Sequence, residues 1–389
     1  MTDPLPVPEE PDHVGRIRAT VARFVADHCP PAARRAWDQA MTWPREVWAA
    51  FRALGFTALT VPPEHGGTGV DIPAALAVVE ELSRAGPFLA GPYIHAAFYG
   101  GLNLAENGSA EQKAHWLPRL ARGEAFLAYG LSEPDVGGDL ASVTTRAERD
   151  GDSIRVTGVK RWCTGADWAD AILTLVRSGP ANERKRNLSF LLIPADARGV
   201  RLSPLAHANL RYSGSFDVVF DDVRVPEGAV LGGPSMWNRG WEQLVGRALA
   251  VERLEIAAVA LGMARAALDE ALAYARQRVQ FGQPIARHQA IRHRLADAAA
   301  RLAAARAILA AAARAVQAGQ DGGLFTSMAK LFVTETALEV GLACQRVLGA
   351  YGLSDGFDME RNVRDLLGMP IVGGSSDMQR NNVAALLGL

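Results

Sequence analysis

The period of the hydrophobic pattern changes twice along this 389-residue chain, and that change limits the folds the chain can adopt. Between about Phe126 and Gly233, apolar residues alternate in short runs bounded by Gly, Pro, Asp or Asn. Such runs predict strands of a small antiparallel sheet, here at 153–157, 171–176, 188–193 and 216–220. On both sides of this region apolar residues recur at spacings of three and four, which predicts helices.

The expected fold class is therefore α+β and multidomain, because a chain of this length exceeds what one core usually holds. We expect an N-terminal α-helical domain at 1–125, a middle antiparallel β domain at 126–233 and a C-terminal four-helix-bundle domain at 234–389. The longest periodic segments are 244–273, 285–318 and 325–348, where alanine and arginine suit closely packed antiparallel helices.

Local signals fix some helix ends in the first domain. Pro44 suits the first turn of a helix over 45–54 that closes on Gly55. Asp71 opens a second helix that runs through Ser83. The sequence Ser109-Ala-Glu-Gln112 is a capping-box pattern for a third helix.

Composition excludes several function classes. The chain is 49% hydrophobic and 21% charged, with a formal net charge of −1, which argues against a nucleic-acid surface or a polybasic membrane patch. Its three cysteines are widely spaced, so neither a disulfide framework nor a metal site follows and a reducing compartment is expected. The segment Met1–Pro11 is proline-rich and acidic, unlike a signal peptide, and no apolar run has transmembrane length. We therefore expect a cytoplasmic protein.

One loop stands out as a candidate ligand site. Tyr129-Gly-Leu-Ser-Glu-Pro-Asp-Val-Gly-Gly-Asp139 follows a half-apolar, strand-like entry and combines a hydroxyl, a carboxylate, a proline and two adjacent glycines. Gly137 and Gly138 allow the backbone to approach a ligand closely, and such loops present N–H groups to anionic or strongly hydrogen-bonding ligands. Taken alone, the same residues also suit an ordinary surface turn.

Six motifs, in order along nearly the whole chain, resemble those of the acyl-CoA dehydrogenase family. They are Pro63-Glu-His-Gly-Gly-Thr-Gly69, Gln112-Lys with Leu117-Pro118 and Gly123-Glu124, Leu131-Ser-Glu-Pro134 with Gly137 and Asp139, Thr157-Gly-Val-Lys-Arg-Trp-Cys-Thr164, Phe220-Asp-Asp-Val-Arg-Val-Pro226, and Arg278-Val-Gln-Phe-Gly282 with Gln289. Each motif alone is a weak signal, whereas their shared order is specific.

The resemblance implies a flavoprotein that holds FAD between the middle domain, the C-terminal bundle and a neighbouring subunit. It implies that Ser132 bonds the pyrimidine edge of the flavin, that Trp162 covers one face and that Thr164 lies near the reactive nitrogen. Arg278 and Phe281 would reach the FAD of a partner, where the guanidinium suits a pyrophosphate. The remaining cofactor residues implied are Tyr129, Leu131, Gly137, Gly138, Gln289, Arg346, Gly349, Ser375 and Asp377.

The family removes an α-proton from an acyl-CoA thioester with a glutamate base. In many members this glutamate opens a Glu-Gly-Thr-Ser-x-x-Gln-Arg motif, but here the matching segment is Gly373-Gly-Ser-Ser-Asp-Met-Gln-Arg380. A minority, including isovaleryl-CoA dehydrogenase, carries the base on a bundle helix, and Glu252-Arg-Leu lies at the equivalent place. Glu252 is therefore the expected base, with Arg253 beside the substrate and Gly138, Gly373 and Gly374 as further substrate contacts.

Two other interpretations of this region remain. Glu252 is also compatible with a solvated helix glutamate near Arg247 and Arg253. Glu255 competes for the role of base, although a residue three positions along shares only part of the same helix face. Glu133 is interpreted as a structural member of its loop.

Several departures from the family pattern bear on the substrate. Gly138 stands where a hydroxyl residue often holds the CoA pyrophosphate, and Ala250 replaces an aspartate that often contacts CoA. The expected function is α,β-dehydrogenation of an acyl-CoA with electrons passed to an electron-transfer flavoprotein, in a homotetramer or in a heterotetramer with a homologous chain. The alternatives are a flavin-dependent monooxygenase or oxidase on the same fold and a half-site subunit of a heteromeric dehydrogenase. The acyl group is not fixed by the sequence.

Overall fold

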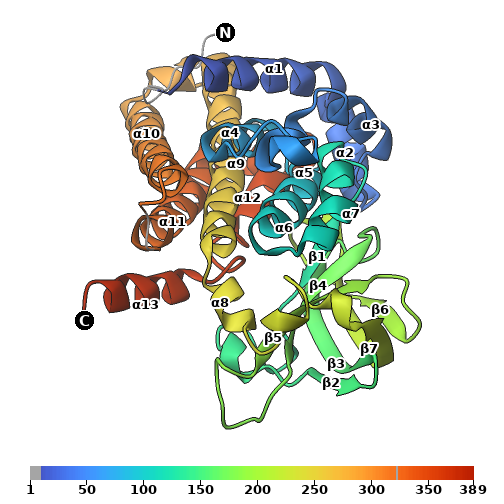
Figure 1. Ribbon diagram of the computed structural model, residues 1–389. Coiled ribbons are helices and arrows are strands. Elements are labelled where there is room, and N and C mark those ends of the chain that lie inside the picture. The colour runs from blue at the N-terminus through green and yellow to red at the C-terminus, as the bar shows by residue number, and fades with distance from the viewer. Residues whose placement is uncertain (1–9, 321–322) are drawn as a thin grey trace.

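The computed structural model describes residues 10–320 and 323–389, and it places a layer of helices above a twisted sheet (Figure 1). The expectation that no signal peptide is present concerns mainly residues 1–9, which lie outside the described residues. The N-terminal helices are α1 (Asp12–His28), α2 (Pro31–Gln39), α3 (Arg45–Arg52), α4 (Ile72–Ser83), α5 (Ala90–Ile94), α6 (Asn103–Asn107) and α7 (Ala110–Ala121). Between α5 and α6 the helix widens into a π-helical segment, η3 (His95–Leu102).

Side-chain caps explain where these helices begin. The Asp71 carboxylate accepts from the Ala74 N–H at 3.0 Å and starts α4. Ser109 and Gln112 form the reciprocal capping box of α7, as the sequence predicts. Pro44 precedes α3 as its N-cap instead of occupying the first turn, and Gly55 follows the helix in the left-handed conformation.

The middle region forms one mostly antiparallel sheet. Its strands are β1 (Leu127–Gly130), β2 (Arg146–Asp150), β3 (Ser153–Thr164), β4 (Ala171–Arg177), β5 (Leu188–Pro194), β6 (Val200–Pro204) and β7 (Ser215–Pro226). The order is β1-β4-β2-β3-β7-β6, with β5 paired to β4. β4 pairs in parallel with both β1 and β2. The alternation of apolar and polar residues does not predict this direction, which is possible because long connections lead into β4.

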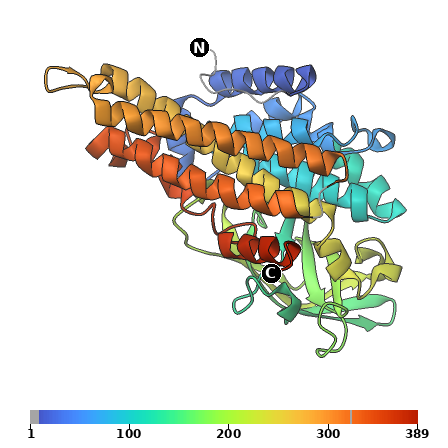
Figure 2. The ribbon, with the colours of Figure 1, turned by 90° about the vertical axis from the view of Figure 1, so that its left-hand side faces the viewer.

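The C-terminal region is built on three long helices that run side by side (Figure 2). They are α9 (Arg247–Gln277), α10 (Gln289–Gln317) and α11 (Leu324–Leu348). Shorter elements complete it: α8 (Gly240–Leu244), a hairpin of β8 (Val279–Gln280) and β9 (Gln283–Pro284), α12 (Met359–Leu366) and α13 (Ser376–Leu386). Alanines line much of the buried face of α9, and their small side chains let neighbouring helices approach closely.

α9 connects the two helical regions because α4 packs across it. The packing is tight at Gly262, where an added Cβ would lie 2.2 Å from the Glu80 carbonyl oxygen. The buried Glu80 side chain pairs with Arg18 of α1 and Arg265 of α9, which compensates the charges removed from water. This contact fixes α9 at Gly262 and Arg265, about three to four turns after Glu252. Among the described helices, none is long and apolar enough to span a bilayer.

Candidate active site

The loop after β1 is held by a buried carboxylate. Glu133 accepts hydrogen bonds from Thr144 N–H at 2.7 Å, Thr145 N–H at 2.8 Å and Lys160 Nζ at 2.9 Å. Burial would raise the pKa of Glu133, but Lys160 and the Thr144 bonds outweigh it and hold that pKa at about 2. Glu133 is thus an ionised structural anchor, which agrees with its interpretation from the sequence.

This anchor leaves other groups of the loop open. The Arg161 N–H donates to the Ser132 carbonyl at 2.9 Å, which joins the loop to β3, while the Ser132 hydroxyl has no partner among the described residues. Leu131 is partly buried, and its carbonyl accepts from Lys160 at 3.0 Å. Gly137 has open space at its Cβ position, whereas a Cβ on Gly138 would lie 2.9 Å from Met378 Sδ of α13.

Trp162 lies at an irregularity of β3. The register between β3 and β7 shifts between Lys160 and Cys163, and Trp162 adopts a φ of +65° with 56% of its surface exposed. A bulge that re-aims a side chain is frequent beside active sites, and an exposed indole in a strained conformation suits a ring-stacking platform. Thr164, just beyond, has its hydroxyl 3.1 Å from that of Ser215.

Glu252 lies on the face of α9 toward these elements. Protein surrounds its side chain on most sides, yet it keeps some accessible surface, as a group lining a small cleft would. Desolvation raises the pKa of Glu252 to about 7, and Arg253 opposes this only in part. Its charge also raises the pKa of Tyr129, so the two side chains are close neighbours. Arg253 itself points to α11, where it donates to Thr326 Oγ1 at 3.4 Å.

Gly373 packs against the same face of α9. A Cβ added to Gly373 would lie 2.8 Å from Cγ1 of Ile256, which is one helical turn after Glu252. Gly373 has a φ of +61°, a conformation that favours glycine. The N–H groups of Gly373 and Gly374 have no acceptor among the described residues. The two positions that the sequence comparison suggested for a base, Glu252 and Gly373, therefore lie close together, although 120 residues of chain separate them.

The next two predicted residues begin α13. Ser375 is its N-cap and accepts from the Met378 N–H at 3.3 Å, and the carboxylate of the exposed Asp377 pairs with Arg380 at 2.8 Å. The start of α13 is tied to the preceding glycine, because the Gln379 side-chain amide donates to the Gly374 carbonyl at 3.0 Å.

A polar cluster lies beside Glu252, and the sequence motifs did not reveal it. The Tyr99 ring stacks on Tyr129 at a centroid distance of 4.2 Å, and Asn103 donates to Tyr129 Oη at 2.7 Å. Glu255 of α9 is fully buried, and the phenol of Tyr99 is close enough that the two groups affect each other's pKa. The available signal was a pair of polar side chains, Tyr99 and Asn103, four residues apart in a mostly apolar helical stretch.

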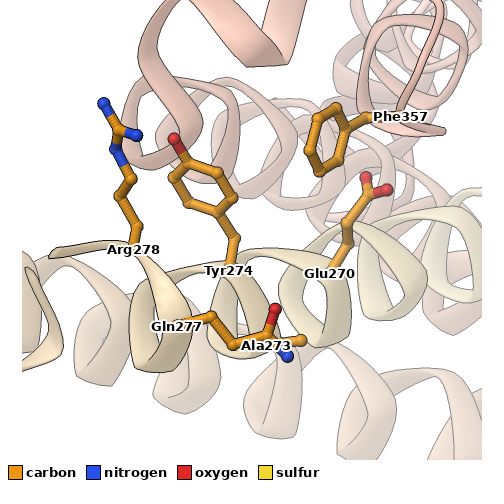
Figure 3. Close-up of a pocket in the computed structure, with 6 residues that line it drawn as sticks. All are labelled: Glu270, Ala273, Tyr274, Gln277, Arg278 and Phe357. Atoms are coloured by element: carbon orange, nitrogen blue, oxygen red, sulfur yellow. The ribbon is translucent and has the colours of Figure 1, made fainter. Parts of the chain in front are cut away.

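The remaining predicted cofactor residues lie far from this cluster. Arg278 caps the other end of α9, so about 39 Å of helix separates it from Glu252 at 1.5 Å per residue. There Arg278 lies over the Tyr351 ring at 5.7 Å, and it lines an open pocket of about 340 Å³ with Tyr274, Glu270 and Phe357 (Figure 3). The same end carries Gln289, Arg346, Gly349 and Phe281, which is 93% exposed.

Within the described residues, no group of three or more His, Cys, Asp or Glu side chains could hold a metal ion. The local chemistry thus consists of a half-buried carboxyl of raised pKa, unpartnered N–H and O–H groups and an exposed aromatic ring.

Fold and site together define an oxidoreductase of the type that removes hydrogens from an acyl thioester. The chain belongs to the acyl-CoA dehydrogenase family: the N-terminal, middle and C-terminal domain models of that family match residues 11–124, 128–223 and 238–388. The family is FAD-binding, and this chain is an oxidoreductase of the acyl-CoA dehydrogenase type.

Known proteins cover the chain almost completely. It is 33% identical over 372 residues to the probable acyl-CoA dehydrogenase YngJ of Bacillus subtilis, covering 95% of this chain and 97% of that protein. It is 32% identical over 373 residues to a 3-(aryl)acrylate reductase of Clostridium sporogenes, with the same coverage. A glutaryl-CoA dehydrogenase of Mycobacterium smegmatis, solved in complex with FADH2, superposes with a TM-score of 0.87 at 26% identity, covering 98% of this chain and 96% of that one.

The residues present fit a flavin. The Ser132 hydroxyl has no protein partner, Gly137 has open space above it and Trp162 exposes its ring. These are the features that a flat, hydrogen-bonding ring system requires.

Proposed function

We propose that this enzyme dehydrogenates an acyl-CoA thioester between Cα and Cβ, with Glu252 as the base. One observation carries the proposal: Gly373, where many relatives have the glutamate, packs on Ile256 one turn from Glu252. A carboxylate at either position would therefore serve the same cleft. The glycine leaves that cleft open to the side chain from α9.

The reaction removes one proton and one hydride. Glu252 in its ionised form takes the proton from Cα, and a carbon–carbon double bond forms as the hydride leaves Cβ, which gives a 2-enoyl-CoA. FAD, when bound, supplies the hydride acceptor. A base with a pKa of about 7 is about half ionised at neutral pH and matches a weakly acidic proton better than an ordinary carboxylate does.

The unpartnered N–H of Gly373 supports a second element of the mechanism. A backbone donor aimed at the thioester carbonyl would stabilise the negative charge that develops when the proton leaves. Loss of the side chain at this position does not remove the donor. Gly374, Gly138 and Arg253 are proposed as further contacts of the substrate.

FAD would bind across two subunits. Its flavin ring would contact Tyr129, Leu131, Ser132, Gly137, Gly138, Trp162, Thr164, Ser375 and Asp377. Arg278, Phe281, Gln289, Arg346 and Gly349 would reach the FAD of a partner, because the length of α9 keeps them away from the flavin loop of their own chain. This supports a tetramer of paired dimers. We also propose an electron-transfer flavoprotein as electron acceptor and domain boundaries at about 125 and 233.

Anaerobic titration tests the proposal. Acyl-CoA thioesters should bleach the flavin of the purified holoenzyme, and E252Q should keep FAD while losing at least about 10³-fold in the rate of reduction. E339Q, which removes an exposed α11 carboxylate paired with Arg301 at 2.7 Å, serves as the matched control with an unchanged rate. Failure of every thioester, with oxygen insertion in the presence of NADH and a flavin reductase, would replace this function by that of a monooxygenase.

A further inference from the structure

The polar cluster beside Glu252 has hydrogen-bonding capacity that the described residues do not use. Glu255 has 0% exposure, and within residues 10–320 and 323–389 neither of its carboxyl oxygens has a hydrogen-bond partner at normal distance and angle. The Tyr99 hydroxyl lies close enough to lower the pKa of Glu255, so Tyr99 and Glu255 form one polar pair. Tyr129 Oη accepts from Asn103 at 2.7 Å, which leaves its own proton free to donate. A buried polar group without a partner is unfavourable, so such groups usually mark a place where a ligand or water completes the bonding.

Burial disfavours the ionised form of Glu255. Desolvation raises its pKa well above the ordinary range, and the charge of Glu252 raises it further, while the phenol of Tyr99 acts in the opposite direction. The neutral acid is a donor through its O–H and an acceptor through its carbonyl oxygen. A saturated hydrocarbon chain could satisfy neither group.

The cluster lies next to the base, where α9 packs against η3. Glu255 and Ile256 follow Glu252 on α9, and Tyr99 and Tyr129 keep partial exposure, so their rings line accessible space. Asn103 and Asn107 hold this wall in place, because Asn107 donates to Asn103 at 2.9 Å and Asn103 donates to Tyr129.

The charges nearby favour a neutral ligand group over an anionic one. Glu252 itself is acidic, and Glu106 is paired with Arg247 at 3.4 Å. Arg253, the next cation, contacts Thr326 on α11. A carboxylate on the acyl chain would therefore face acidic groups.

From this geometry we infer that the enzyme's preferred acyl group carries a neutral oxygen function, a hydroxyl or keto group, beyond Cβ, bound by Tyr99, Tyr129 and Glu255. This inference rests on the proposed function and adds the class of substrate. Tyr99 and Glu255 are specificity-determining residues on this account, and Glu252 remains the base.

The test uses pairs of thioesters with equal carbon skeletons. Hexanoyl-CoA is compared with 5-oxohexanoyl-CoA and 5-hydroxyhexanoyl-CoA, and cyclohexane-1-carbonyl-CoA with its 4-hydroxy derivative, by anaerobic flavin reduction of the holoenzyme. We expect kcat/KM to be at least about 10-fold higher for the oxygenated member of one or both pairs, the scale of one buried hydrogen bond.

The variants Y99F and E255L should lower that ratio toward one, whereas E339Q should leave it unchanged. Both members of a pair use the same base, so an indirect effect of Glu255 on Glu252 would change both rates and leave the ratio intact. If E255L does not fold, Y99F alone decides the matter, because it deletes one hydroxyl and keeps the ring stacked on Tyr129.

Two outcomes are distinct. If no thioester bleaches the flavin, the proposed function fails. If thioesters are reduced but the wild-type ratio stays near one in both pairs, or persists in both variants, then only water completes the bonding of the cluster and the inference is overturned.

Discussion

Glu133 is buried and Glu252 is half-buried, and the surroundings of the two carboxylates give them opposite properties. Glu133 receives hydrogen bonds from two backbone N–H groups and from Lys160, and its pKa falls to about 2. Glu252 has no comparable set of hydrogen-bond donors, and desolvation raises its pKa to about 7. A fully bonded carboxylate fixes the flavin loop, whereas a poorly solvated one is suited to move a proton.

The largest effect is expected from moving the base to the position that many relatives use. In the double variant E252Q/G373E, the new Cβ would lie 2.8 Å from Ile256 Cγ1 on a residue with a φ of +61°. We therefore expect flavin reduction to stay about 10³-fold below wild type. Adding I256G should restore at least about 10-fold by giving the side chain room. Near-wild-type reduction by the double variant alone would show that Ile256 does not constrain this position.

The structural role of Glu133 predicts a loss of stability. E133Q leaves the fully buried Lys160 without its charged partner, and we expect the free energy of unfolding to fall by about 3 kcal/mol. Urea denaturation of the holoenzyme measures this, with E339Q as an exposed control that changes little. Equal midpoints for E133Q and wild type would remove the distinction between the two carboxylates.

A smaller effect concerns the pH dependence of stability. The folded pKa of Glu252, about 7, exceeds the usual unfolded value of about 4.3, so the folded protein binds this proton more tightly. Its contribution to stability therefore declines as pH rises from about 4.3 to about 7.

E252Q should remove that decline and become more stable than wild type by roughly 3 kcal/mol at pH 7.5, with a difference below about 1 kcal/mol at pH 4.5. For Glu133 the sign is opposite, because its contribution is lost as pH falls from about 4.3 to about 2. A difference between E252Q and wild type that does not vary with pH would contradict the raised pKa.

The sequence predicted the order of helical, β and helical regions, because the switch between periods of two and about 3.6 is strong. Caps at Asp71 and Ser109 were readable because their side chains bond locally. The parallel pairing of β4 was not readable, because strand direction depends on how distant segments cross. The π-helical turn that places Tyr99 also left no local signal.

The candidate site likewise combines residues that local sequence motifs predict with contacts that only the folded chain produces. Motif spacing predicted a flavin loop and two positions for a base, but only the fold brings Gly373 onto Ile256. Glu255 illustrates the limit best: its place on α9 was evident, whereas its complete burial opposite Tyr99 depends on how α9 packs against η3. The assignment of roles to these residues remains a prediction.

Exchange of the α-proton in D2O tests the central claim most directly, because it isolates proton removal from hydride transfer. Wild-type holoenzyme should incorporate deuterium at Cα of a thioester whose Cβ hydride is blocked, such as a 3-thiaacyl-CoA. E252Q should exchange at least about 10³-fold more slowly, while E255Q stays within about 10-fold of wild type. Wild-type exchange in E252Q, or an equal loss in E255Q, would show that Glu252 is not the base.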